Sequence, residues 1–181
     1  ARLFATHTAL LEPAPAPEAD ATPVVEFRRW TEEDVPTFRE LLDDPRVWEH
    51  LPESHPDPFT DEVARTLIDI SRIELHHDAT AVVVDGRPVG QCVVRFDDPV
   101  GSVRAAEVSY WLGHEHWGRG LMSAVLPRFT ARAFALHPDV EVVYAWISPR
   151  NPASARVAER SGYHRDTSRI EPMVADSIRR P

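Results

Sequence analysis

Lysine is absent from this 181-residue sequence, and cysteine occurs only once. The single Cys92 excludes an intramolecular disulfide and a cysteine-cluster metal site, and its apolar neighbours predict an ordinary core residue. No apolar run approaches the roughly 20 residues that a membrane-spanning helix needs. The first residues lack a basic segment followed by a long apolar one, so no signal peptide and no membrane association are predicted. We therefore expect a cytoplasmic protein.

Positive charge is scarce in one part of the chain. The net charge is −9, and residues 31–62 alone hold eleven acidic residues against two arginines. The rest of the chain is balanced, with 18 acidic residues and 18 arginines. A chain without a basic face is not expected to bind nucleic acid. The acidic segment has two interpretations that the sequence leaves open: a solvated surface, or a field that attracts a cationic ligand.

Proline and alanine dominate the start of the chain. Four prolines interleaved with alanine lie within residues 1–23, which predicts a flexible N-terminal arm because neither a helix nor an inner strand tolerates them. Residues 24–181 are predicted to form a single domain, since their number suits one compact core. Periodicity and turn residues predict the order β-α-α-β-β-β-α-β-α-β, with an Asp-Gly hairpin turn. The expected strands are 24–28, 79–84, 88–96, 105–112, 140–147 and one more at the end, and helices are expected to begin near residues 31, 60, 120 and 152.

The loop after residues 105–112 has the composition of an anion-binding site. It reads Trp117-Gly118-Arg119-Gly120-Leu121-Met122 and opens a helix. Amides at a helix N-terminus favour a negative charge, glycine lets the backbone approach a phosphate, and the arginine adds a positive charge. A Gly-x-Gly turn alone is equally typical of a loop that needs only backbone flexibility.

A second segment makes the pattern specific. The strand at 140–147 is followed by Asn151-Pro152-Ala153-Ser154, a helix, and Ser161-Gly162-Tyr163. Together with Glu107-Val108-Ser109-Tyr110-Trp111-Leu112 and the glycine loop, this sequence resembles the GNAT superfamily of N-acetyltransferases. It is most similar to the RimJ/RimL-like branch, the ribosomal-protein N-terminal acetyltransferases, and the resemblance covers roughly residues 24–165.

The resemblance implies a fold and a cofactor. The fold is α+β (mixed α/β), with a central mixed, mostly antiparallel sheet that is splayed between its fourth and fifth strands and flanked by about four helices. Acetyl-CoA would lie at the splay, with the pyrophosphate on the loop amides and the pantetheine arm along the fourth strand. Asn151 would hydrogen-bond the arm, and Ser154 would lie near the thioester sulfur. The implied cofactor-binding residues are Trp111, Leu112, Trp117, Gly118, Arg119, Gly120, Leu121, Met122, Asn151 and Ser154.

The sequence departs from the superfamily at the catalytic positions. Many relatives place a tyrosine four residues after the serine position as general acid, whereas Ala158 stands here. Ser154 is therefore our candidate to protonate the leaving thiolate, and Glu107 is our candidate base, acting through a water. The amide of Leu112 is the natural donor to the thioester carbonyl. A solvated carboxylate at a strand end remains an equal interpretation of Glu107.

The acceptor is expected under the first two helices, which overhang the acceptor site in this superfamily. Trp48 and Glu49 are the predicted substrate-binding residues, although a plain core tryptophan is an equal interpretation of Trp48. The acceptor would be a primary amine, either a protein N-terminus or a small cationic molecule, and the protein a monomer or homodimer. The alternative function is a non-catalytic acyl-CoA-binding module. Paired histidines occur, but without the pattern of a metal site, so we predict no metal.

Overall fold

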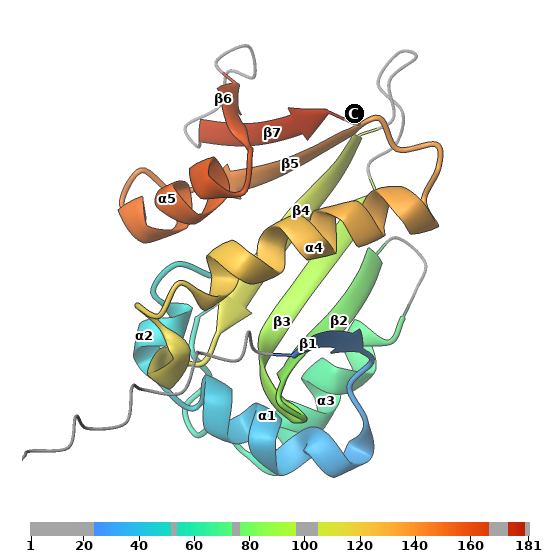
Figure 1. Ribbon diagram of the computed structural model, residues 1–181. Helices are drawn as coiled ribbons and strands as arrows, with labels where there is room; N and C mark the ends of the chain where they lie inside the picture. Colours follow the sequence, from blue (N-terminus) through green and yellow to red (C-terminus); the bar gives the residue numbers. More distant parts are fainter. Residues whose placement is uncertain (1–23, 52–53, 74–76, 97–104, 167–173, 180–181) are drawn as a thin grey trace, which may run out of the picture.

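The computed structural model describes residues 24–51, 54–73, 77–96, 105–166 and 174–179 (Figure 1). The predicted N-terminal arm, residues 1–23, lies outside the described residues. One seven-stranded sheet runs through the molecule in the order β1-β2-β3-β4-β5-β7-β6. Its strands are β1 (Val25–Arg28), β2 (His77–Val84), β3 (Arg87–Phe96), β4 (Ala105–Leu112), β5 (Val142–Ile147), β6 (His164–Asp166) and β7 (Val174–Arg179). Neighbouring strands are antiparallel except for β4 and β5, which are parallel, so the predicted mixed sheet is confirmed.

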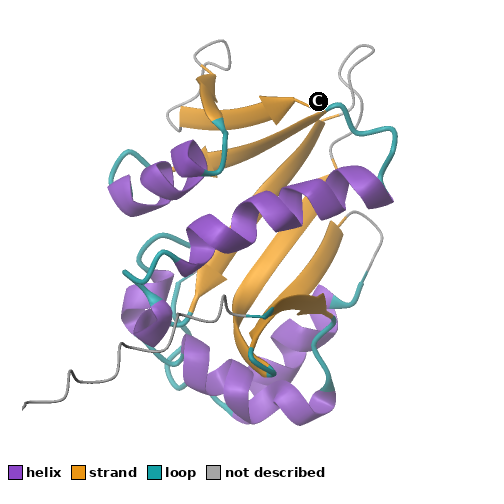
Figure 2. Ribbon diagram, in the orientation of Figure 1, coloured by secondary structure: helices purple, strands orange, loops and turns teal. Residues whose placement is uncertain are grey.

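Helices cover both faces of this sheet (Figure 2). They are α1 (Val35–Leu42), α2 (Pro45–Trp48), α3 (Asp61–Ser71), α4 (Leu121–Leu136) and α5 (Pro152–Arg160), with 3-10 turns at Glu32–Asp34 and His114–His116. Val82 packs in the core cluster of α4, whereas its neighbours Ala81 and Val83 pack with α1 and α3. Because successive strand residues point to opposite faces, the two clusters lie on opposite sides of the sheet. None of the described helices is long and apolar enough to cross a membrane.

The sequence signals for turns and helix ends correspond to local geometry. Asp85 and Gly86 both have positive φ, 49° and 79°, as a tight hairpin turn between β2 and β3 requires. The short helix α2 is absent from the predicted elements, because a proline commonly marks the end of a helix. Asp44 instead caps α2, accepting a hydrogen bond from the Arg46 amide at 3.0 Å, and proline is tolerated at a first helical position.

β4 and β5 diverge after a short parallel contact. Their pairing runs only from Ala105 opposite Val142 to Glu107 opposite Tyr144. Beyond this point β5 continues to pair with β7 up to Ile147, while β4 continues beside β3 up to Leu112. The predicted splay between the fourth and fifth strands is therefore confirmed, and it leaves one edge of β4 beside a widening gap.

Candidate functional site

The backbone of β4 presents alternate residues to the gap. Gly113 donates its amide to the Val89 carbonyl at 3.0 Å, so this pair is hydrogen-bonded across β3 and β4. In an antiparallel ladder such pairs alternate with pairs whose N–H and C=O groups point outward. With the observed register, Trp111 directs its backbone groups to β3, whereas Tyr110 and Leu112 direct theirs toward the diverging side. Of the two predicted strand contacts of the cofactor, Leu112 has the required orientation.

The side chain of Trp111 belongs to an aromatic cluster on the α1 face. Its ring stacks on the ring of Trp30, with 6.3 Å between the ring centroids, and makes an edge-to-face contact with Phe38, with 5.7 Å between the centroids. Trp30 in turn donates its indole N–H to Gln91 at 2.8 Å. These contacts fix β4 against α1 and so hold the end of the strand in place.

The glycine loop is tied to the end of β4. The Trp117 indole donates to the Leu112 carbonyl at 2.8 Å, and its ring remains 42% exposed beside the start of α4. Gly118 and Gly120 have φ of 73° and 71°, and a Cβ on either residue would meet nothing within 4 Å. The left-handed backbone, and not crowding, is therefore what favours glycine there. The loop ends at Leu121, where α4 begins and its first amides can bind an anion.

Ser154 and Asn151 lie on the other side of the gap, at the start of α5. The Asn151 side-chain oxygen accepts from the Ser154 amide at 3.0 Å and caps the helix. The Ser154 hydroxyl lies 2.8 Å from the hydroxyl of Tyr110 on β4. Sequence reasoning missed Tyr110: strand alternation puts it on the same face as Leu112, but nothing in the sequence shows that a residue 44 positions away meets it.

A buried polar contact joins α4 to the segment that follows α5. The Thr130 hydroxyl donates to the Leu126 carbonyl at 2.9 Å and lies 2.7 Å from the Tyr163 hydroxyl, which therefore donates to it. Burial raises the pKa of Tyr163, so this group stays protonated. Ala158 is fully buried in the same core, which leaves no acid at the position where relatives carry a tyrosine.

Glu107 lies on the opposite face of β4 from Tyr110 and Ser154. Its side chain is 19% exposed and forms an ion pair with Arg95 at 3.3 Å. Leu112 is five positions further along the strand, a distance of about 16 Å. A base at Glu107 would therefore reach a thioester held near Leu112 only through water.

The two predicted substrate-binding residues have different surroundings. Trp48 is buried, donates its indole N–H to the Leu42 carbonyl at 2.7 Å, and packs against Phe59 and His55. The plain core interpretation of Trp48 fits these contacts. Glu49, the next residue, is exposed.

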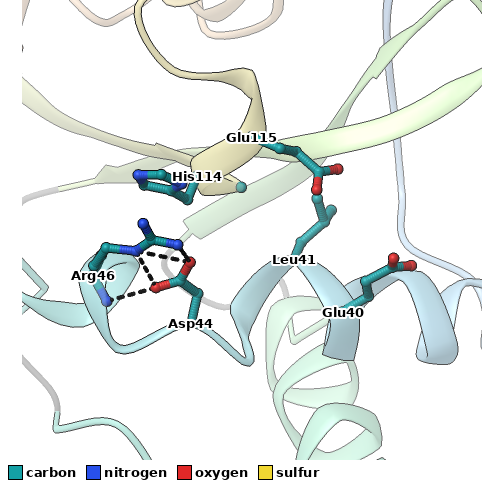
Figure 3. A pocket seen from close by; sticks show the side chains of 7 residues that line it. Glu40, Leu41, Asp44, Arg46, His114 and Glu115 are labelled. Carbon is teal, nitrogen blue, oxygen red and sulfur yellow. Dashed lines mark hydrogen bonds and ion pairs between the residues drawn. The ribbon is translucent and has the colours of Figure 1, made fainter.

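A polar pocket of about 180 Å³ lies between the α1–α2 connection and the loop after β4 (Figure 3). Asp44 and Arg46 face each other across one side through a bidentate pair, and these hydrogen bonds lower the pKa of Asp44 to about 2. His114 and Glu115 approach from the loop. The lining residues are Glu40, Leu41, Asp44, Arg46, Gly113, His114 and Glu115. Three carboxylates against one arginine make this pocket suited to a cation.

Gly113 brings the pocket and the strand end together. A Cβ at Gly113 would meet a terminal methyl group of Leu41, so a larger residue there would require that side chain to move. No group of three histidine, cysteine or acidic side chains suited to a metal occurs among the described residues.

The comparisons with known proteins decide the family. The acetyltransferase (GNAT) domain family matches residues 25–164. The chain belongs to the GNAT acetyltransferase family. No curated protein matches the sequence. Among solved structures, aminoglycoside acetyltransferase AAC(6′)-Ib in complex with coenzyme A is similar with a TM-score of 0.71 and 19% identity, over 87% of this chain and 95% of that one.

Two further solved structures have a similar fold. Mycobacterium smegmatis RimJ in complex with CoA-disulfide has a TM-score of 0.71 and 19% identity, over 87% of this chain and 86% of its own. Spermidine N-acetyltransferase from Vibrio cholerae, in complex with CoA and spermine, has a TM-score of 0.67 and 12% identity, over 84% of this chain and 92% of its own. RimJ and the aminoglycoside enzyme are equally similar to this chain, so these likenesses do not single out the RimJ/RimL-like branch.

Proposed function

We propose that this GNAT protein transfers the acetyl group of acetyl-CoA to a primary amine by direct attack in a ternary complex. The observation that carries the proposal is the divergence of β4 from β5 beside a glycine loop and Ser154. Backbone groups, an anion-binding helix start and a hydroxyl thus border one gap. Coenzyme A complexes of the similar structures support the same cofactor.

The chain's residues would hold the cofactor along this gap. The pyrophosphate would bind the amides of residues 117–122, with Arg119 adding charge. The pantetheine arm would pair with the outward backbone groups of β4, in particular those of Leu112. The carboxamide oxygen of Asn151 is used in the α5 cap, so its N–H groups would donate to the arm.

Catalysis requires a neutral amine, a polarised carbonyl and a protonated leaving group. The Leu112 amide would polarise the thioester carbonyl, and Ser154 would donate to the departing sulfur. At pH 7, deprotonating an α-amine of pKa ~8 costs about 1.4 kcal/mol, whereas an amine of pKa ~10.4 costs about 4.6 kcal/mol. Glu107 would assist as base through water, and a peptide N-terminus needs less of this assistance than a polyamine.

The acceptor would enter at the acidic pocket beside Gly113. Glu40, Asp44 and Glu115 would attract a cationic amine, and they lie next to the strand end where the thioester would bind. Two of the similar proteins, by name, act on polycationic amines: an aminoglycoside and spermidine. RimJ is equally similar, so a protein N-terminus remains the other acceptor class.

A thiol-release assay with acetyl-CoA and a panel of peptides, polyamines and aminoglycosides tests the proposal. Turnover with at least one amine, mass spectrometric detection of the N-acetyl product, and loss of turnover in Ser154→Ala and Glu107→Gln are expected. Coenzyme A binding without turnover of any amine, and no effect of either substitution, would instead support a non-catalytic binding module. Mass spectrometry of a cell extract treated with the enzyme would identify the natural acceptor.

A further inference from the structure

Tyr110 on β4 contacts Ser154 of α5 through its hydroxyl group. Its hydroxyl lies 2.8 Å from the Ser154 hydroxyl and 3.3 Å from the Ser154 carbonyl. The shorter distance is the usual length of an O–H···O hydrogen bond, and the longer one exceeds it. Of these two Ser154 atoms, the hydroxyl oxygen is therefore the closer partner of the Tyr110 phenol.

This contact, together with the α5 cap, holds Ser154 from two sides. Its amide is bonded to the Asn151 side chain at 3.0 Å, and its hydroxyl meets Tyr110. A serine hydroxyl has one proton and two lone pairs. When the phenol donates to it, the serine proton is free to point elsewhere, and the position is the first turn of α5, where negative charge is favoured.

We propose that Tyr110 is a positioning residue that donates its hydroxyl proton to Ser154 and thereby directs the serine proton at the sulfur of coenzyme A. The inference rests on the proposed function, because it assumes that the thioester lies in the gap between β4 and β5. It adds a residue from β4 to a catalytic group that the sequence places on α5 alone.

The proton transfers of the proposed reaction follow one another from Tyr110 to Ser154 to the sulfur. The amine nitrogen forms a bond to the thioester carbon, and the carbon–sulfur bond breaks. The sulfur takes the Ser154 hydroxyl proton, Ser154 takes the Tyr110 proton, and the phenolate recovers a proton, through water, from the ammonium group of the adduct. Without the phenol, Ser154 would be left as an alkoxide, which is a far stronger base than a thiolate. The phenol, with an ordinary pKa of about 10, makes the serine a usable donor.

Steady-state kinetics of Tyr110→Phe, Ser154→Ala and the double variant test this relay. Tyr110→Phe should lower kcat by about tenfold to a hundredfold while changing KM for acetyl-CoA by less than about twofold. The double variant should be no slower than Ser154→Ala, because both substitutions break one relay. The proposal would be overturned if the losses of kcat in the two single variants multiplied in the double variant. It would also be overturned if Tyr110→Phe changed only KM or left kcat unchanged.

Tyr163→Phe is the matched control. It removes a buried phenol hydroxyl whose hydrogen bond, at 2.7 Å, is to Thr130 of α4 and not to Ser154. Its kcat should stay within about twofold of the wild type, whereas general acid–base groups contribute far more. Ser154→Thr, which keeps a hydroxyl, should recover part of the activity lost in Ser154→Ala.

A titration of bound coenzyme A needs no acceptor and separates this proposal from the proposed function. The ultraviolet absorbance of the thiolate reports the pKa of the bound thiol. This pKa should be lowest in the wild type, and Tyr110→Phe and Ser154→Ala should raise it by similar amounts, with no further rise in the double variant. If the wild type acetylates no amine but shows this pattern, the proposed function fails and the Tyr110–Ser154 arrangement stands. A thiol pKa unaffected by Tyr110→Phe would overturn the arrangement itself.

Discussion

At the scale of single residues, Asp34 shows how one carboxylate organises the start of the domain. It accepts two hydrogen bonds from Arg28, at 2.6 and 2.9 Å, and further bonds from the amide and hydroxyl of Thr31. Burial acts to raise the pKa of Asp34, but the bonds from Arg28 and Thr31 outweigh it, so the pKa is lowered. The ion pair thus joins the end of β1 to the turn that precedes α1.

Asp34→Asn is expected to destabilise the protein by about 1–3 kcal/mol at pH 7, because it leaves Arg28 without a charged partner. A carboxylate with a lowered folded-state pKa contributes stability above its unfolded pKa of about 3.9, and loses it as pH falls through the folded value. The difference between wild type and variant in urea unfolding should therefore shrink below about pH 4. A difference that stays constant from pH 7 to pH 3 would contradict this prediction.

The burial of Cys92 and Trp48 is a further feature at this scale. Cys92 is fully buried, and burial raises the pKa of its thiol, as expected of a core residue and not of a nucleophile. Trp48 is likewise enclosed by core contacts.

At the scale of elements, the cap of α5 and the proposed contact of Asn151 with the cofactor can be separated. The cap uses only the side-chain oxygen of Asn151. Asn151→Ala should lose about 1 kcal/mol of stability, whereas Asn151→Asp keeps a capping oxygen and should lose little. Both lack the N–H donor, so both should weaken coenzyme A binding by roughly tenfold. Calorimetric binding and thermal unfolding of the pair provide the test; normal affinity in Asn151→Asp would show that the amide group does not contact the cofactor.

The glycine loop provides a second comparison at this scale. Gly120→Ala should destabilise the protein by about 1–2 kcal/mol because of its positive φ of 71°. The added methyl group would lie where the proposed phosphate approaches, so the dissociation constant of coenzyme A should rise as well. Gly86→Ala is the control: it has φ of 79° and equally open surroundings, but lies in the β2–β3 turn. Equal affinities of the two variants would place the phosphate elsewhere.

At the scale of the whole molecule, the uneven charge distribution is the feature with a kinetic consequence. The net charge of −9 equals that of residues 31–62, and three acids of the polar pocket lie in or beside this segment. The remaining chain is neutral, so a cationic acceptor would be drawn to one region of the surface.

We expect kcat/KM for a cationic acceptor to fall as ionic strength rises, since the screening length is only about 10 Å at 0.1 M salt. Glu40→Gln should weaken this salt dependence, because Glu40 lines the pocket. Glu26→Gln removes one exposed charge from β1 and should leave the dependence unchanged. A kcat/KM that does not change with salt for the true acceptor would show that the acidic segment is only a solvated surface.

The sequence by itself determined the local features: the Asp-Gly turn, the glycine loop before α4, the start of a helix near residue 152 and the positions of β1 to β5, whereas two strands, β6 and β7, stand where one was expected. Each depends on residues that are neighbours in the chain, because backbone preferences and strand periodicity act over short distances. The family and the splay followed from the combination of these motifs. The helix α2 was missed because a proline ends one helix and can also begin another.

Only the tertiary structure decided which side chains meet. It directs the backbone N–H and C=O groups of Leu112, but not those of Trp111, toward the gap. It also places the Glu107 side chain on the opposite face of β4 from Ser154, and brings the Tyr110 hydroxyl to within 2.8 Å of the Ser154 hydroxyl. These relations depend on the register of β3 with β4 and on how α5 packs against α4, β5 and β7. Both are set by contacts between residues far apart in sequence, which no local pattern contains.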